Sequence, residues 1–234
     1  MEENKKLHML LSILFPERCK YCNKVIDLRH TICKTCENTL YTIGKDICKK
    51  CGTEKEFCRC DGQKMFYESI CAPFYYEGAA TKGLQNLKFR NHPEVAKVFA
   101  KDMAECFINN FSGYDFDYCT FVPSTKESLK KRGYNQAKLL AENMCSIIDL
   151  ECKELLFKTQ DTVPQHTLSG IERSGNLLGA FTVNDKVNIE NKRILLCDDI
   201  KTTGSTLNEC AKTLLIGGAA EVFCITAAIA RKTE

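Results

Sequence analysis

The chemistry of this chain is concentrated between Ile194 and Thr206. An apolar run ends in two adjacent acids, and four hydroxyl residues around one glycine follow before a helical pattern begins. Such a turn can direct backbone N–H groups at one point, and a helix start adds about half a positive charge, so the segment suits a phosphate. Paired carboxylates suit the two cis hydroxyls of a ribose, because each ionised oxygen accepts a hydrogen bond. We predict that Asp198 and Asp199 hold the sugar and that the phosphate lies on Thr202, Thr203, Gly204, Ser205 and Thr206.

The alternative for this segment is an ordinary Asp-Asp turn with a threonine cap on the next helix. That alternative accounts for only a few of the residues and leaves their order unexplained. We therefore favour a phosphate site beside a carboxylate pair, which together describe a 5-phosphoribosyl group.

A run of cations follows another predicted strand. The strand ends at Val122-Pro123-Ser124, and three lysines and Arg132 come before Gly133 and the next helical pattern. Cationic side chains near the carboxyl end of a strand suit a pyrophosphate or its magnesium complex. A Lys/Arg run by itself is more typical of a solvated surface. Beside the phosphate segment we assign pyrophosphate binding to Arg132, and the lysines stay unassigned.

Eight of the sixteen cysteines lie in short-spaced pairs between Cys19 and Cys60. Each pair can supply two corners of a tetrahedron, and four thiolates are a usual ligand set for structural zinc. A segment this short has too small a core to fold alone, and a zinc site contributes on the order of 10 kcal/mol. Disulfides or incidental thiols are the alternative, and the closing Cys-x-Cys pair has the less usual spacing. We predict structural zinc at one or both of two sets, Cys19, Cys22, Cys33 and Cys36, and Cys48, Cys51, Cys58 and Cys60.

Pairing within each set is the simplest arrangement, and a cross-braced one stays open. The other eight cysteines are scattered through apolar or helical surroundings, where a thiol behaves as a small buried hydrophobe. So many unpaired thiols favour a reducing compartment, so we expect a cytoplasmic protein. No apolar run reaches the roughly 18 residues that span a bilayer, and no membrane insertion is expected. We interpret Leu7–Phe15 as a short apolar helix, because no small-residue cleavage site follows it.

Beyond residue 64 the chain alternates helical and strand-like patterns. Strand, helix and strand in this order imply an α/β domain with a parallel sheet. We therefore predict two domains, a cysteine-rich one at 1–64 and an α/β one at 65–234. The polar stretch Lys158–Phe181 has no period and is predicted to be a lid over the ligand. The predicted elements are helices near Glu94–Ile108, Ala137–Ile148 with Asn135 as cap, and Thr206–Leu215, and strands near Tyr118–Val122, Arg193–Cys197 and Val222–Ala230.

The net charge of +3 is too small to indicate nucleic acid binding by itself. The excess lies before residue 65, where 13 basic and 9 acidic residues give +4. Two zinc ions held by four thiolates each would cancel it, and aromatic residues for base stacking are few there. A purely DNA-binding zinc protein is therefore disfavoured.

Several further motifs follow the cysteine pairs in a fixed order. They are Phe74-Tyr75-Tyr76-Glu77-Gly78, Leu87-Lys88-Phe89, Arg132-Gly133-Tyr134-Asn135-Gln136-Ala137, Thr162-x-x-Gln165-x-x-Leu168-Ser169, Arg173-x-x-Asn176 and Phe181. The Asp-Asp segment that closes the series resembles the phosphoribosyl pyrophosphate motif of type I phosphoribosyltransferases. The whole order resembles the ComF family of bacterial double-zinc-ribbon, phosphoribosyltransferase-like proteins. One departure is Lys158, which stands where the family pattern has an arginine and so lacks the two-pronged guanidinium.

The resemblance implies a type I phosphoribosyltransferase-like parallel sheet flanked by helices, with an N-terminal zinc-ribbon module. It implies that phosphoribosyl pyrophosphate binds with magnesium, and that the protein acts in natural competence. Single-stranded DNA and proteins of the competence machinery are the partners that it suggests. Two activities stay open: a phosphoribosyltransferase with an unidentified acceptor, or a non-catalytic adaptor that senses the ligand and binds DNA or a protein. A turnover assay for pyrophosphate release separates them.

Overall fold

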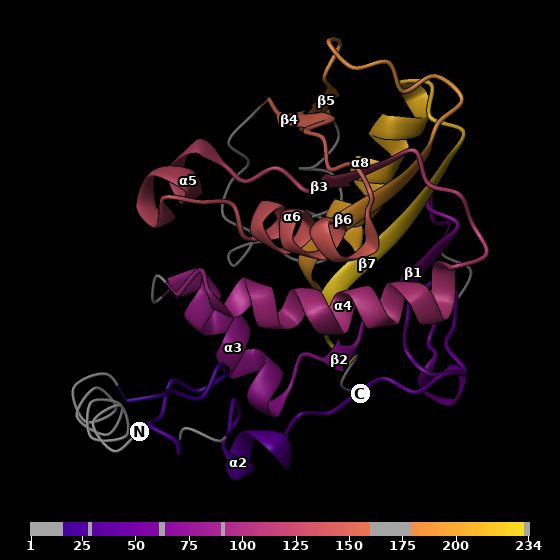
Figure 1. Cartoon of the computed structure of the whole chain (residues 1–234). Helices are drawn as coiled ribbons and strands as arrows, with labels where there is room; N and C mark the ends of the chain where they lie inside the picture. The colour runs from indigo at the N-terminus through magenta and orange to yellow at the C-terminus, as the bar shows by residue number, and fades with distance from the viewer. Residues whose placement is uncertain (1–15, 28–29, 61–63, 90–91, 160–178, 232–234) are drawn as a thin grey trace.

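A parallel sheet forms the centre of the protein (Figure 1). The computed structural model describes residues 16–27, 30–60, 64–89, 92–159 and 179–231 of the 234-residue chain. Within these residues every strand pair of the central sheet is parallel. In sheet order the strands are β1 (Ser69–Cys71), β7 (Glu221–Ile229), β6 (Arg193–Lys201) and β3 (Tyr118–Phe121), with β2 (Phe74–Tyr75) pairing with β7 after β1.

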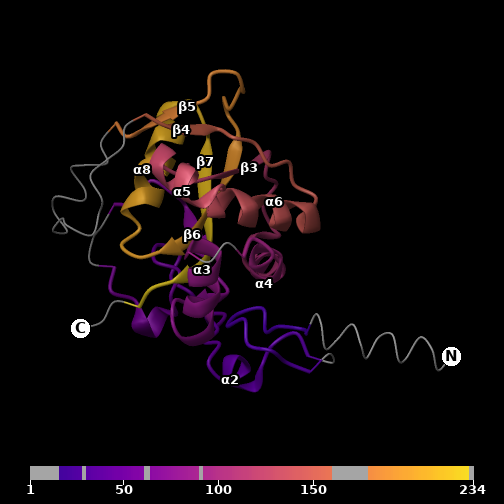
Figure 2. The same cartoon turned by 90° about the vertical axis from the view of Figure 1, so that its left-hand side faces the viewer.

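The two central strands are apolar on both faces, as a parallel sheet covered by helices requires. Leu195 and Phe223 belong to the core shared with one group of helices, whereas Ile194 and Val222 belong to the core on the other face. Figure 2 shows the sheet between these two layers, with α8 on one side and α4 and α6 on the other. The helices of the first layer are α3 (Gly78–Phe89), α4 (Val95–Phe111) and α6 (Gln136–Ile148), and the helix of the second is α8 (Ser205–Ile216).

The long periodic elements were predicted well. Helix α4 extends three residues beyond the predicted end, and α6 begins after Asn135, whose side chain accepts a hydrogen bond from the Lys138 N–H at 3.3 Å. Strand β6 is longer than predicted, since pairing with β7 continues to Lys201 opposite Ile229. Asp198 and Asp199 therefore lie inside the last part of this strand and not beyond its end.

Several shorter elements were not predicted. Helix α5 (Lys126–Arg132) contains the cation run, begins at the Thr125 cap and ends at Gly133, whose φ of 79° is left-handed. Strands β4 (Leu156–Lys158) and β5 (Phe181–Val183) pair antiparallel, so the two ends of the predicted lid are held together. Residues 160–178 of that lid, and the predicted helix before residue 16, lie outside the described residues.

The cysteine-rich segment contains only short helices, α2 (Lys34–Glu37) and the 3-10 helix η1 (Lys55–Phe57). It packs directly onto the α/β layers. Tyr21 is 1% exposed, and its ring meets Phe74 and Phe99 edge-on at centroid distances of 6.5 and 5.3 Å. Among the helices that the structure describes, none has the length and apolar character needed to cross a membrane.

Candidate functional site

The predicted phosphate segment forms a tight turn between β6 and α8. Gly204 starts the helix with a φ of 84°, a conformation that side chains rarely adopt. A Cβ added there would lie 3.1 Å from Lys201 Cε, so the turn also leaves little room for a side chain. The Thr203 and Ser205 hydroxyl oxygens lie 3.0 Å apart, and the Ser205 N–H donates to Thr203 Oγ1 at 3.3 Å. Hydroxyls and the first N–H groups of a twelve-residue helix thus meet at one turn, which suits an anion.

The two acids before this turn occupy different surroundings. Asp199 is 7% exposed and forms an ion pair with Lys88 Nζ at 2.7 Å. Asp198 is half-buried, and its Oδ1 accepts a hydrogen bond from the Asp199 N–H at 2.8 Å. Burial, followed by the negative charge of Asp199, raises the pKa of Asp198 to about 8. The Asp199 carboxylate is therefore already paired with a cation, whereas the pKa of Asp198 lies near neutral pH.

Lys88, at the end of α3, is a site residue that the sequence reasoning did not assign. Burial acts to lower its pKa, but the charge and hydrogen bond of Asp199 outweigh this effect, so its pKa is raised. Its signal in the sequence is the motif Leu87-Lys88-Phe89, to which no chemical role could be assigned from the sequence.

Arg132 and Lys88 line the same cavity, which has a volume of about 400 Å³. The guanidinium of Arg132 donates to Gln136 Oε1 at 3.1 Å and lies 5.3 Å from the centre of the Phe89 ring. Gln136 is 4% exposed, and its amide nitrogen has no hydrogen-bond partner among the described residues. Of the three lysines in the run, only Lys131 lines this cavity. The structure thus groups three cations around one cavity, and one of them, Lys88, is paired with Asp199.

The eight paired cysteines form two clusters, one from each predicted set. In each cluster all four sulfur atoms lie within 4.8 Å of one another, so the structure groups the sulfurs by set and not across the two sets. In the first cluster the Cys33 N–H donates to Cys19 Sγ, and the Cys36 N–H to Cys33 Sγ, both at 3.4 Å. Such N–H···S bonds orient thiolate ligands. Four convergent thiols with these donors fit a tetrahedral zinc ion at each cluster.

The second cluster, Cys48, Cys51, Cys58 and Cys60, lies beside the predicted phosphate-binding turn of residues 202–206, called the phosphate turn below. Cys51 and Cys60 border the same small cavity as Thr202 and Thr203. The Tyr67 hydroxyl donates to the Lys50 carbonyl, inside the Cys48–Cys51 pair, at 2.8 Å. The same hydroxyl would lie 3.8 Å from a Cβ added to Gly204, so Tyr67 bonds to the cysteine loop and also lies close to the turn.

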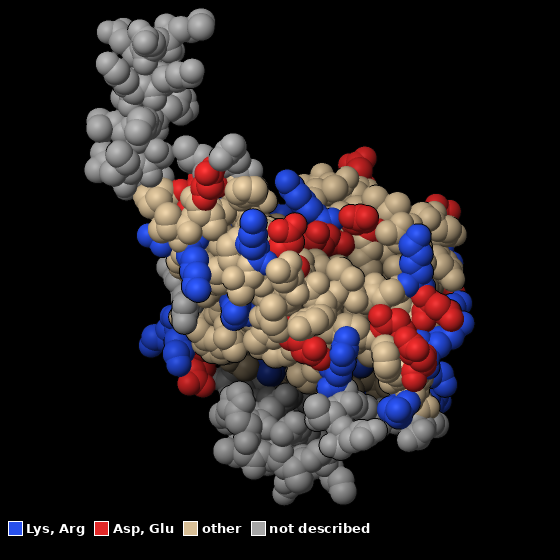
Figure 3. All heavy atoms as spheres, turned by 90° about the horizontal axis from the view of Figure 1, so that it is seen from below, with Lys and Arg blue, Asp and Glu red and all other residues tan. Residues whose placement is uncertain are grey.

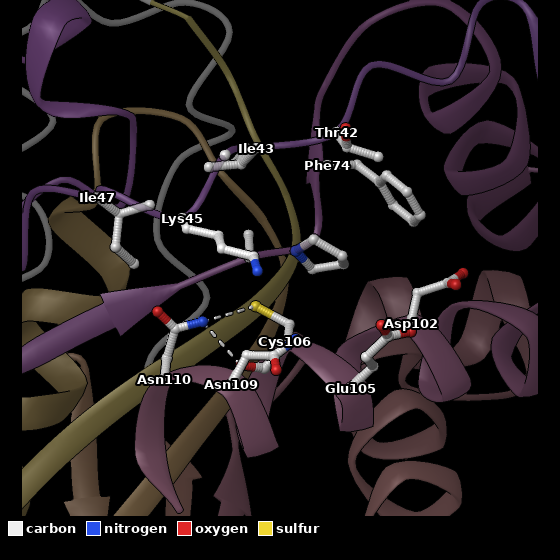
Figure 4. Close-up of a pocket in the computed structure, with 13 residues that line it drawn as sticks. Thr42, Ile43, Lys45, Ile47, Phe74, Asp102, Glu105, Cys106, Asn109 and Asn110 are labelled. Atoms are coloured by element: carbon white, nitrogen blue, oxygen red, sulfur yellow. Dashed lines mark hydrogen bonds between the residues drawn. The ribbon is translucent and has the colours of Figure 1, made fainter.

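Another cavity, of about 380 Å³, lies between α4 and residues 42–47 (Figure 4). Lys45 faces it from the cysteine-rich segment, and Asp102 and Glu105 face it from α4. None of the residues predicted to bind a phosphoribosyl group lines it. On the face seen in Figure 3, basic and acidic side chains are mixed and do not form one continuous basic patch.

Comparisons with known proteins match both parts of the chain. A family model for the double zinc ribbon domain matches residues 10–73, and one for the phosphoribosyl transferase domain matches residues 129–234. The DNA utilization protein YhgH of Escherichia coli (strain K12) is 27% identical over 222 residues, which cover 90% of this chain and 96% of that protein. Competence protein ComFC of Streptococcus pneumoniae (strain ATCC BAA-255 / R6) is 29% identical over 196 residues, with 82% and 84% covered.

The chain thus carries a double zinc ribbon domain and a phosphoribosyl transferase domain, and over most of its length it is similar to competence proteins, as the resemblance to the ComF family predicted. Its fold is therefore a type I phosphoribosyltransferase-like sheet with an N-terminal zinc ribbon, as the order of motifs predicted. Among solved structures, the allosteric regulatory enzyme of purine biosynthesis matches this chain with 18% identity and a TM-score of 0.40. That match covers 61% of this chain and 30% of the other, and it adds nothing to the assignment.

Proposed function

We propose that this protein binds phosphoribosyl pyrophosphate with magnesium at the carboxyl edge of its sheet. The observation that carries the proposal is the convergence of three features at this edge. The ion pair of Lys88 with Asp199 links the cavity of Lys88 and Arg132 to the carboxylate pair, and the hydroxyl-lined turn at Gly204 follows that pair in the chain. Each feature suits one part of the ligand: the ribose hydroxyls, the 5-phosphate and the pyrophosphate.

In this proposal Asp198 and Asp199 accept hydrogen bonds from the ribose hydroxyls. Residues 202–206 hold the 5-phosphate through backbone N–H groups and hydroxyls. Arg132 binds the pyrophosphate, with Lys88 and Lys131 adding positive charge to the same cavity. Magnesium, when bound with the ligand, neutralises the pyrophosphate charge. Lys158, which stands where the family pattern has an arginine, keeps the positive charge but cannot form a bidentate contact, so Arg132 is the main bidentate donor.

We further propose a role in DNA uptake. Two observations support this role. Relatives that match most of the chain are named competence and DNA utilization proteins, and the chain has both a double zinc ribbon domain and a phosphoribosyl transferase domain. The division at residue 64 into a structural zinc-binding part and a ligand-binding part belongs to the same proposal, as does a place in the cytoplasm. Pyrophosphate release with an acceptor would make the protein a pentosyltransferase, whereas ligand binding without release would make it an adaptor for DNA or a protein partner.

The test is calorimetric titration of the zinc-loaded full chain with phosphoribosyl pyrophosphate, with and without magnesium. We expect a Kd in the micromolar range that needs magnesium and is lost in an Asp198→Asn/Asp199→Asn variant. Replacing the exposed Asp185 with asparagine removes a carboxylate outside the site and should leave the Kd unchanged. Because the pKa of Asp198 is raised to about 8, affinity that depends on its ionised form should increase as the pH rises from 7 to 9. Absence of binding by the folded wild-type chain would overturn the proposal.

A further inference from the structure

Three cysteines outside the zinc ribbons converge at the edge of the sheet. Cys119 lies in β3, Cys145 lies near the end of α6, and Cys152 lies in the segment that follows. Their sulfur atoms all lie within 4.8 Å of one another, as do those of each ribbon cluster. The sequence had suggested only scattered, buried thiols, because the three positions have no metal-ligand spacing.

The backbone holds this group in place. The Cys119 N–H donates to the Glu151 carbonyl and the Lys153 N–H donates to the Cys119 carbonyl, both at 2.8 Å, so Cys152 pairs with Cys119 in a single parallel bridge. Between Cys145 and Cys152 the chain reverses at Asp149, whose φ is 54°, and the Asp149 N–H donates to the Cys145 carbonyl. The positions of the three sulfurs are therefore set by hydrogen-bonded backbone on both sides.

We propose that Cys119, Cys145 and Cys152 form a third metal site, which binds one thiophilic ion such as Zn²⁺ through three thiolates. Soft thiolate ligands select ions of this class, and three protein ligands leave one position open for water. Cys119 is fully buried and Cys145 is 4% exposed, whereas Cys152 is half-buried and provides the side from which an ion enters.

A cationic side chain acts on this group of cysteines. Three thiolates around a divalent ion carry a net charge of −1, and the positive charge of Lys138, on the same helix as Cys145, acts on Cys152. Binding would release the three thiol protons to solvent. No fourth His, Cys, Asp or Glu joins the group among the described residues, so the site differs in ligand number from the two ribbon sites.

The ion would join β3 to α6 next to the proposed pyrophosphate region. Strand β3 continues into Val122, whose carbonyl accepts a hydrogen bond from the Asn135 side chain at 2.9 Å at the start of α6. The site therefore connects the two elements whose other ends frame the cation run. It does not depend on which ligand that region binds.

The test is the number of Zn²⁺ ions on the full chain at saturating, buffered free zinc, by native mass spectrometry and elemental analysis. We expect three ions on the wild type, two on Cys145→Ala and Cys152→Ala, and three on Cys106→Ala. Cys106 is the matched control, since it is also half-buried and outside the three cysteine groups. Two ions on the wild type, or three on Cys152→Ala, would overturn the proposal.

A second measurement separates loss of the site from loss of the fold. With ¹¹³Cd²⁺ as the probe, the wild type should give three cadmium resonances, one of them outside the range of four-thiolate sites. Cys152→Ala should lose that resonance alone and keep the two ribbon resonances. Loss of a ribbon resonance in its place would show that the third ion had been assigned wrongly.

Discussion

The two ribbon clusters have the same ligands but different surroundings. In the first, Cys19 and Cys36 are 2% and 1% exposed, and the cluster adjoins the aromatic core through Tyr21. The Tyr21 carbonyl also accepts a hydrogen bond from the buried Asn86 side chain of α3 at 2.6 Å. In the second cluster all four cysteines are half-exposed. Its neighbours are β1 and the phosphate turn.

This difference indicates that the same zinc chemistry has two uses in one chain. A metal next to a buried core stabilises the packing of α3 and α4, because its loss would leave buried thiols and an unsupported Tyr21. The second cluster lies next to a turn with few buried apolar side chains, so a metal there mainly fixes the backbone. One such backbone position is the Lys50 carbonyl, which accepts a hydrogen bond from Tyr67. The first cluster should therefore control stability, and the second should control ligand affinity.

The largest expected effect is the loss of a ligand from the first cluster. Cys36→Ser should reduce zinc to one ribbon ion and lower the free energy of unfolding by several kcal/mol, since a structural zinc contributes on the order of 10 kcal/mol. Cys58→Ser, in the half-exposed cluster, should cost clearly less. Denaturant unfolding of the zinc-loaded proteins measures both. Equal losses in the two variants would remove the distinction between the clusters.

The next effect is on ligand affinity, where the order should reverse. In Cys58→Ser the phosphate turn loses its support from the cysteine loop, and we expect the Kd for phosphoribosyl pyrophosphate to rise about tenfold, which corresponds to roughly 1.4 kcal/mol. The measurement is titration at a temperature where the variant is folded by circular dichroism. An unchanged Kd together with a lost zinc ion would mean that the second cluster does not support the turn.

A subtler version of this test leaves the metal in place. Tyr67→Phe removes one hydrogen bond to the Lys50 carbonyl while it keeps the ring, at a cost of about 1 kcal/mol. The zinc content should stay the same and the Kd should rise several-fold. Tyr41→Phe, at a residue that is 45% exposed in the same cysteine-rich segment, is the control and should change neither.

The sequence predicts those features of these regions that depend on residues close together in the chain. The Asn135 cap, the periodic face of α4 and the Gly204 turn are local patterns, and they were found. Helix α3 was missed because small residues and the buried Asn86 interrupt its apolar face. Strands β1 and β2 are too short to show a period, and pairing with β7 defines them.

The site shows the same limit. Both cysteine sets could be assigned from spacing, and the Asp-Asp segment from its order. The ion pair between Lys88 and Asp199 joins residues that are far apart in the sequence, and so does the group of Cys119, Cys145 and Cys152. Neither could be predicted without the packing of α3 and α6 on the sheet. The contact between the second cluster and Thr203 is likewise a result of folding.

The smallest expected effect is on the pH dependence of stability, through Asp102, which contacts Tyr21 next to the first cluster. Asp102 accepts a hydrogen bond from the Tyr21 hydroxyl at 3.3 Å, and burial, aided by the charge of Glu105, raises the pKa of Asp102 to about 6. The folded protein therefore holds a proton here between pH 4 and 6 that the unfolded chain releases, so this contribution to stability falls as the pH rises through that range. In Asp102→Asn the amide oxygen can still accept from Tyr21, and this pH dependence should disappear. Thermal unfolding of both proteins from pH 4 to 7 gives the comparison, and parallel curves would mean that Asp102 does not link the first cluster to pH.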